Sequence, residues 1–218
     1  MTTSITTALF LQSVQQTLYM ASVSFLCGAV LGMGLAWLLI LTRPNGLKQH
    51  IVLYSVASTV INALRSLPAL ILMIAVTPLA HWIIGTSTGS SAMIVPLTLF
   101  ISPYIARLVE NSLLDIDPGI IEAANAMGAT TFQIVWHFWL PEAVPSIILS
   151  YTTSLITLIG ATAMAGAIGG GGIGDLAISY GYQRFDNVAM AITVITLILT
   201  VQLLQSLGNA LSRWTKLT

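Results

Sequence analysis

Charged side chains are scarce in this sequence. Lys, Arg, Asp and Glu make up 6% of the 218 residues, and the formal net charge is zero. A water-soluble domain carries charge at about a quarter of its positions, so too little polar surface is present here to cover a water-soluble globule. Hydrophobic residues make up 56% of the chain. The composition therefore predicts an all-α integral membrane protein without a basic face for nucleic acid.

Several other features are rare or missing. Cys27 is the only cysteine, so no intrachain disulfide can form. No Lys or Arg precedes Arg43, and a cleavable signal peptide has a basic N-terminal region, so we expect no cleavage. His50, His81 and His137 are too dispersed along the chain to suggest a metal site.

The gaps between charges mark the membrane spans. About twenty apolar residues cross the hydrocarbon core, and the apolar stretches between the clusters of charge accommodate five such spans. We expect them at about 14–41, 52–77, 91–113, 145–165 and 188–211, in one transmembrane domain covering residues 1–218.

The distribution of Lys and Arg predicts the orientation. Arg43 and Lys48 follow the first span, Arg107 lies near the end of the third, and Arg213 follows the fifth. With five spans these cations fall on one side, which the positive-inside rule assigns to the cytoplasm. The N-terminus is then expected outside, the C-terminus inside, and the segment at about 117–141 in the cytoplasm.

That segment has the signals of two short helices at the membrane surface. Asp117 suits an N-cap before Pro118, and Gly128 suits the left-handed residue that ends a helix. Thr130 and Gln133 have the spacing of a capping box, and Pro141 is expected to end or bend the second helix. An interfacial hairpin that merely connects two spans has the same signals. A DNA-binding helix-turn-helix is disfavoured because the segment has no Lys or Arg.

The segment also carries a recognisable motif. The run "EAANAMGA" at 122–129, followed by Ile134 and "LPEA" at 140–143, resembles the EAA loop of permease subunits of ATP-binding-cassette importers. Five further stretches extend the resemblance to the permeases of bacterial methionine importers: "TRP" at 42–44, "NALRSLPALIL" at 62–72, "GTSTGSSAMIVPLT" at 85–98, "PYIARLVENSLL" at 103–114 and the region 155–182.

The resemblance implies a function and a set of partners. The chain is then a permease, not an enzyme, that moves D- and L-methionine across the bacterial inner membrane by alternating access. Its partners are a second copy of itself, two cytoplasmic ATPase subunits that hold ATP and Mg²⁺, and an extracytoplasmic substrate-binding lipoprotein. The positions implied to dock on the ATPase are Glu122, Ala123, Ala124, Met127, Gly128 and Ala129. The chain itself has no Walker motif, because its run "GGGGIGD" lacks the lysine that reaches phosphate.

Arg65 is the one charge well inside an apolar region. An intramembrane charge is costly and normally faces protein or a water-filled cavity. Arg65, with Asn62 and Ser66, is therefore a candidate to meet a substrate carboxylate or to hold a gate. An ion pair or carbonyl contact within the bundle, or a position near the cytoplasmic interface, would also explain it.

The end of the fourth expected span is rich in small residues, which permit close helix approach and make it a candidate for the symmetry axis of a homodimer. Met164 is the large flexible side chain among them, and it is a candidate plug of the pathway, although a simple packing role is equally compatible. In the following loop, Asp175, Arg184 and Asp186 are expected to be exposed and to face the lipoprotein, and the glycine run is expected to be a flexible turn.

Two other function classes remain alternatives: a permease for another small amino acid or related compound, and an ion-coupled secondary carrier. The carrier is disfavoured because no Asp, Glu or His lies in the middle of an expected span to relay protons. Five spans without inverted repeats are also few for a carrier fold.

Overall fold

The computed structural model describes residues 5–216, and the regular structure in that range is helical. Within this range, four helices are long and apolar enough to cross a membrane, as parts or all of α1 (Thr7–Thr42), α4 (Ser90–Leu114), α7 (Leu140–Ala165) and α9 (Asn187–Lys216), and one bent helix pair passes the same test as a broken fifth span. The shorter helices are α2 (Ile51–Ser66), α3 (Ala69–Ile84), α5 (Pro118–Ala126), α6 (Thr131–Gln133) and α8 (Gly172–Leu176). Wider π-helical turns, η1 (Ile134–Trp139) and η3 (Ala177–Tyr182), adjoin α7 and α8, and η2 (Gly166–Gly170) contains a kink, because Ile168 and Gly169 leave helical geometry.

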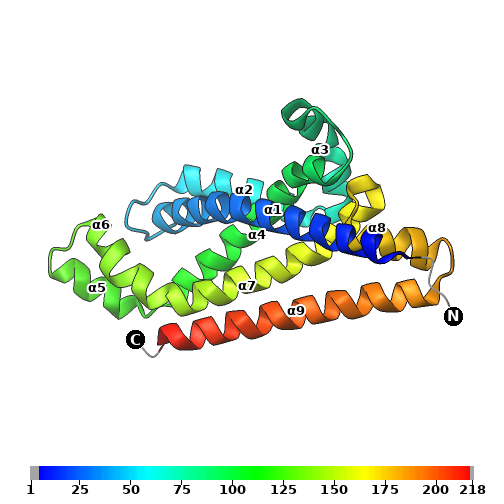
Figure 1. The fold of residues 1–218 in the computed structure, drawn as a ribbon. Helices are drawn as coiled ribbons and strands as arrows, with labels where there is room; N and C mark the ends of the chain where they lie inside the picture. Colours follow the sequence, from blue (N-terminus) through cyan, green and yellow to red (C-terminus); the bar gives the residue numbers. More distant parts are fainter. Residues whose placement is uncertain (1–4, 217–218) are drawn as a thin grey trace.

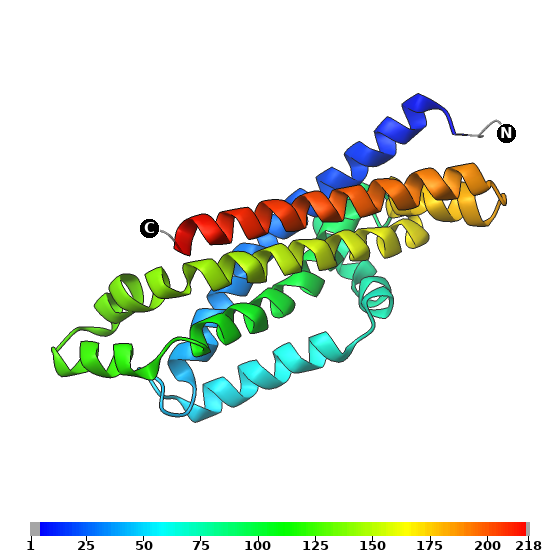
Figure 2. The same cartoon turned by 90° about the horizontal axis from the view of Figure 1, so that it is seen from below.

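The long helices lie side by side and give the molecule two distinct ends. Figure 1 shows α5 and α6 at the end where α9 finishes, and α8 at the opposite end, near the start of α1. Figure 2 shows α9 running along α7, while α2 lies at an outer edge of the bundle. The all-helical membrane-type fold is thus confirmed.

The second expected span is broken. Residues 52–77 were expected to form one helix, but α2 and α3 meet at an angle of 110°. Leu67 is extended and Pro68 is the N-cap of α3, because a residue before proline avoids helical geometry and proline has no amide hydrogen to donate. Helix α3 then continues through Pro78 to Ile84, so the expected loop at 78–90 shortens to 85–89.

Helices α1 and α4 form the most extensive helix pair. One buried stripe along α4 recurs every fourth residue: Leu97, Ile101, Ile105, Val109 and Leu113. It faces Gly28, Gly32 and Ala36 of α1, and a Cβ added at Gly32 would lie 2.7 Å from Ile105 Cβ. This small-residue stripe lets the two backbones approach closely, as helices in membranes commonly do.

Many large apolar side chains remain exposed on the outside of the bundle. On α9 they include Ile195, Leu199, Leu203, Leu207 and Leu211. A soluble monomer rarely exposes so continuous an apolar surface. Such a face is stable against lipid or against another membrane-embedded chain.

The glycine run between α7 and α8 is held in place, contrary to the expectation of a flexible turn. The amides of Gly172 and Ile173 donate to the side chains of Gln16 and Thr17 on α1, each at 2.8 Å. On the other side, the Gly89 amide donates to the Gly169 carbonyl at 2.8 Å. The run is therefore pinned between α1 and the start of α4.

The crossing of α7 and α8 depends on glycine, and this gives a first prediction. A Cβ at Gly174 would collide with the backbone of Ala163, which cannot yield as a side chain can. Gly174→Ala should lower the free energy of unfolding by about 2 kcal/mol, measured as a lower melting temperature in detergent. Gly34→Ala is the matched control, because nothing lies within 4 Å of a Cβ there, and it should be neutral or slightly stabilising. Equal melting temperatures for the two variants would contradict this packing.

Candidate functional site

The helix α5 is fixed at its first turn by its own side chains. Asp117 precedes Pro118, and its Oδ1 accepts from the Gly119 amide at 2.8 Å. The N-cap predicted from the sequence is confirmed. Proline at the first helical position loses no hydrogen bond, because that amide has no partner within the helix.

The other end of α5 closes in a Schellman motif. The Ala129 amide donates to the Ala124 carbonyl at 3.1 Å, and the Gly128 amide donates to the Asn125 carbonyl at 2.9 Å. Gly128 has φ +76°, the left-handed conformation predicted for it. Glycine adopts this conformation without the steric cost that a Cβ brings.

The next helical turn begins with the expected capping box. Gln133 N donates to Thr130 Oγ1, and Gln133 Oε1 accepts from Thr130 N at 2.8 Å. The second short helix does not end at Pro141, however. It passes through the π-helical turns of η1 into α7, and Pro141 is tolerated as the second residue of α7 because η1 has widened the helix before it.

A buried tryptophan ties this segment to the bundle. Trp139 is 4% exposed, and its Nε1 donates to the Leu113 carbonyl at the end of α4 at 3.2 Å. Its ring meets Trp37 of α1 edge to face, with centroids 6.2 Å apart. The segment 117–139 is thus joined firmly to α1 and α4.

The implied docking residues divide into two groups. Ala124 is fully buried and packs in the chain's own core, so it supports α5 from beneath and offers no surface to a partner. Ala129 is half-buried against the same core. Glu122, Ala123, Met127 and Gly128 are exposed, Met127 by 70%.

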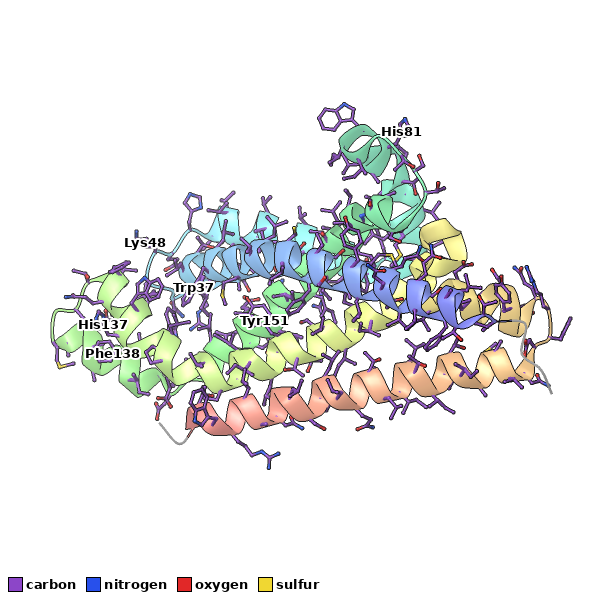
Figure 3. All side chains as sticks on the ribbon, in the orientation of Figure 1. Trp37, Lys48, His81, His137, Phe138 and Tyr151 are labelled. Carbon is purple, nitrogen blue, oxygen red and sulfur yellow. The ribbon has the colours of Figure 1, made fainter. Side chains whose placement is uncertain are left out.

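An open groove adjoins this exposed face. Its volume is about 410 Å³, and it is lined by Met127, Gly128, Ala129, Gln133, His137 and Phe138. Figure 3 shows His137 and Phe138 at the end of the molecule that carries α5 and α6. A flexible, exposed methionine beside such a groove suits contact with another protein.

Glu122 also lines a second cavity that was not predicted. This cavity, of about 300 Å³, lies between α5 and the loop after α1, and its lining includes Arg43, Asn45, Glu122 and Asn125. Arg43 Nε is buried there and has no hydrogen-bond partner in the structure. No sequence spacing indicates that these two segments meet, because the contact depends on how α1 and α5 pack.

The structure brings Asn62, Arg65 and Ser66 together on the last turn of α2, and all three are exposed. The Arg65 guanidinium lies 5.7 Å from the Tyr104 ring centroid of α4. Arg65 was expected within a continuous span, but it lies at the break before α3. A cation there is favoured by the unpaired carbonyls at the helix end.

Met164 lies in the last turn of α7 and is 47% exposed. Its small neighbours were expected to face a second copy of the chain. Gly166 instead faces α8 of the same chain, since a Cβ there would collide with the Asp175 amide. At least part of the small-residue run therefore serves packing within one chain.

Two of the three residues expected to face the lipoprotein are engaged locally. Asp175 is half-buried and accepts from Ser179 Oγ at 2.7 Å. Asp186 caps α9 through the Val188 and Ala189 amides. Arg184 is exposed, as expected, and stacks on the Tyr180 ring at 4.2 Å from its centroid.

Residues 28–216 match the family described as binding-protein-dependent transport system inner membrane component. The chain belongs to this family. The family resemblance read from the EAA run is therefore confirmed, and the chain is a multi-pass inner membrane component of a transporter. It is a transport subunit and not the ATPase.

Curated relatives in this family are similar over most of their length. The probable D-methionine transport system permease protein MetI of Vibrio cholerae is 46% identical over 205 residues, 94% of this chain and 91% of that protein. The D-methionine transport system permease protein MetI of Escherichia coli K12 is 46% identical over 158 residues, 72% of this chain and 73% of that protein.

Solved structures share the fold of this chain. A chain of the MetNI methionine ABC transporter, in an inward facing conformation, aligns with a TM-score of 0.93 and 42% identity, covering 96% of this chain and 97% of that chain. A chain of an amino acid ABC transporter crystallised with histidines aligns with a TM-score of 0.79 at 19% identity, which shows the fold alone.

Proposed function

We propose that this inner membrane component is the permease subunit of an ATP-driven methionine importer, taking D- and L-methionine. The observation that carries the proposal is the 46% identity to a D-methionine permease over 94% of the chain. The capped, exposed α5 gives this permease a means of engaging an ATPase, which a simple interfacial connection would not need.

The orientation follows from the ends of the bundle. We infer that the end carrying α5 faces the cytoplasm, with the start of α1 outside. The loop after α1, which carries Arg43 and Lys48, and the end of α9, which carries Arg213, lie toward that end, whereas the loop before α9, which carries Arg184, lies toward the other (Figure 1). This distribution agrees with the positive-inside rule.

Coupling is assigned to α5. The exposed residues Glu122 and Ala123 of α5, with Met127 and Gly128 at its C-terminal end, enter a cleft on an ATPase subunit, and that subunit holds ATP and Mg²⁺. Because the Schellman motif, the capping box and Trp139 fix α5 to α4 and α7, movement of the ATPase is passed to the spans as a rigid displacement. The assembly contains two permeases, two ATPases and an extracytoplasmic lipoprotein, which Arg184 helps to engage.

The translocation pathway is assigned to the break between α2 and α3. No side chain caps the first turn of α3. The partial positive charge of this helix end and the full charge of Arg65 therefore lie at the same break. Half-helix ends of this kind line substrate sites in other transporters and favour anionic groups. Arg65, with Asn62 and Ser66, there meets the carboxylate of the amino acid.

Met164 is assigned to the gate of the pathway, contributed by each of two copies. Met164→Ala shortens an exposed, flexible side chain in the last turn of α7. We expect a raised ATP-independent leak of methionine from loaded proteoliposomes, with an unchanged amount of assembled complex. Met33→Ala, on a half-buried methionine of α1, is the control for general loosening. If Met164→Ala leaks methionine no faster than the parent, Met164 is not part of the gate.

The proposal requires that the permease assemble with an ATPase, and this can be tested directly. The chain co-expressed with its ATPase should purify in detergent as one complex, and native mass spectrometry should give two permeases and two ATPases. A permease that purifies alone, or as a different oligomer, would contradict it.

A further inference from the structure

A largely apolar groove lies between the end of α1 and the start of the α6–α7 segment. Its volume is about 360 Å³, and it is lined by Trp37, Leu41, Lys48, Thr131, Phe132, Val135, Trp136 and Leu140. It is separate from the groove beside Met127 and from the break at Pro68. Figure 3 shows Trp37 and Lys48 near the end of the bundle that carries α5 and α6.

Aromatic side chains surround this groove in a manner typical of a membrane surface. Phe132 and Trp136 are 68% and 54% exposed, and their ring centroids lie 6.0 Å apart. Trp37 forms the inner wall against Trp139. Tryptophan is favoured where hydrocarbon meets headgroups, because one edge of the indole is polar and the rest is apolar.

A single cation stands at this groove without a counter-charge. Lys48 is exposed, and no carboxylate among residues 5–216 forms an ion pair with it. The Lys48 backbone is held beside the groove, because its amide donates to the Leu41 carbonyl at 3.0 Å. Thr131 lines the same groove, and a threonine hydroxyl can donate a hydrogen bond.

We propose that this groove binds an anionic phospholipid. An acyl chain lies along Leu41, Val135 and Leu140, and the headgroup phosphate meets Lys48 and Thr131. The apolar walls suit the acyl chain of such a lipid, and the aromatic rings suit the boundary between hydrocarbon and headgroup. The ammonium, which has no counter-charge, suits the anionic phosphate. The site does not depend on methionine or on ATP, so its failure and the failure of the proposed function are distinguishable.

Lipid binding is measured by native mass spectrometry of the intact permease complex released from nanodiscs. The probes are phosphatidylglycerol, which is anionic, and phosphatidylcholine, which carries no net charge. Lys48→Gln should weaken phosphatidylglycerol binding about fivefold, the effect of one cation at an anionic surface, and should leave phosphatidylcholine binding unchanged. Lys48→Arg, which keeps the positive charge, should bind phosphatidylglycerol as the parent does.

Arg213→Gln is the matched control, since Arg213 is an exposed cation near the same end of the bundle and does not line the groove. It should retain the phosphatidylglycerol affinity of the parent. The proposal is overturned if Lys48→Gln binds both lipids as the parent does, or if Arg213→Gln loses as much affinity as Lys48→Gln.

A photo-crosslinking residue at position 132 identifies the occupant without altering Lys48. Phe132 is exposed at the groove, so the crosslinked product should contain lipid. Crosslinking to the ATPase, or to a second copy of the chain, in place of lipid would assign the groove to a protein interface and overturn the proposal.

Discussion

Gly128→Val should reduce methionine uptake by about tenfold or more while the permease still reaches the membrane. Gly128 has φ +76°, and a β-branched side chain in that conformation costs at least about 1–2 kcal/mol. The Schellman motif that ends α5 then opens, and the exposed face of α5 changes direction relative to α6. The measurements are uptake into proteoliposomes and the amount of ATPase that co-purifies.

A second left-handed glycine provides a control that distinguishes loss of coupling from the general effect of backbone strain. Gly85 ends α3 with φ +85°, and, like Gly128, it has nothing within 4 Å of an added Cβ. Gly85→Val therefore introduces the same strain at a site remote from α5. It should leave ATPase co-purification at the parent level. An equal loss for both variants, or none for Gly128→Val, would show that the end of α5 is not the coupling contact.

Arg65→Gln should lower methionine uptake at least about tenfold, since a hydrogen bond to a charged group contributes about 1.5–3 kcal/mol. The residue is exposed at the break between α2 and α3, and glutamine keeps much of its length but not its charge. The basal ATPase rate of the complex should not change, because the α5 contact is intact. Uptake and ATPase rate are measured on the same reconstituted sample.

If Arg65 has only a structural role, the effects of substitutions on uptake should differ. If Arg65 only joins α2 to α4 through Tyr104, then Tyr104→Leu should reduce uptake as much as Arg65→Gln. Under the substrate assignment Tyr104→Leu has the smaller effect, and Arg65→Lys retains part of the uptake. Arg213→Gln, at an exposed position in the last turns of α9, controls for loss of a positive charge and should leave uptake unchanged.

The features that sequence predicts well here are local ones. The Asp117 cap, the left-handed Gly128 and the Thr130–Gln133 box each depend on a few adjacent residues, so the spacing alone indicates the geometry. The apolar stretches likewise indicated where most of the spans lie. These predictions needed no knowledge of how the helices pack.

The features that sequence did not reveal depend on packing between distant segments. Composition marks residues 52–77 as apolar but does not show that the chain turns by 110° at Pro68. The EAA run does not show that Ala124 faces inward, because that depends on which side of α5 meets the core. Pro141 is tolerated because η1 has already widened the helix before it, and a single proline does not reveal such a turn.

Transport in a defined system tests the central claim most directly. The permease, its ATPase and its binding protein are reconstituted in proteoliposomes, and uptake of L- and D-methionine is followed with and without ATP. The account predicts methionine accumulation that requires ATP hydrolysis and is lost in Gly128→Val. Accumulation driven by an ion gradient in the absence of ATP, or ATP-driven uptake that excludes methionine, would contradict it.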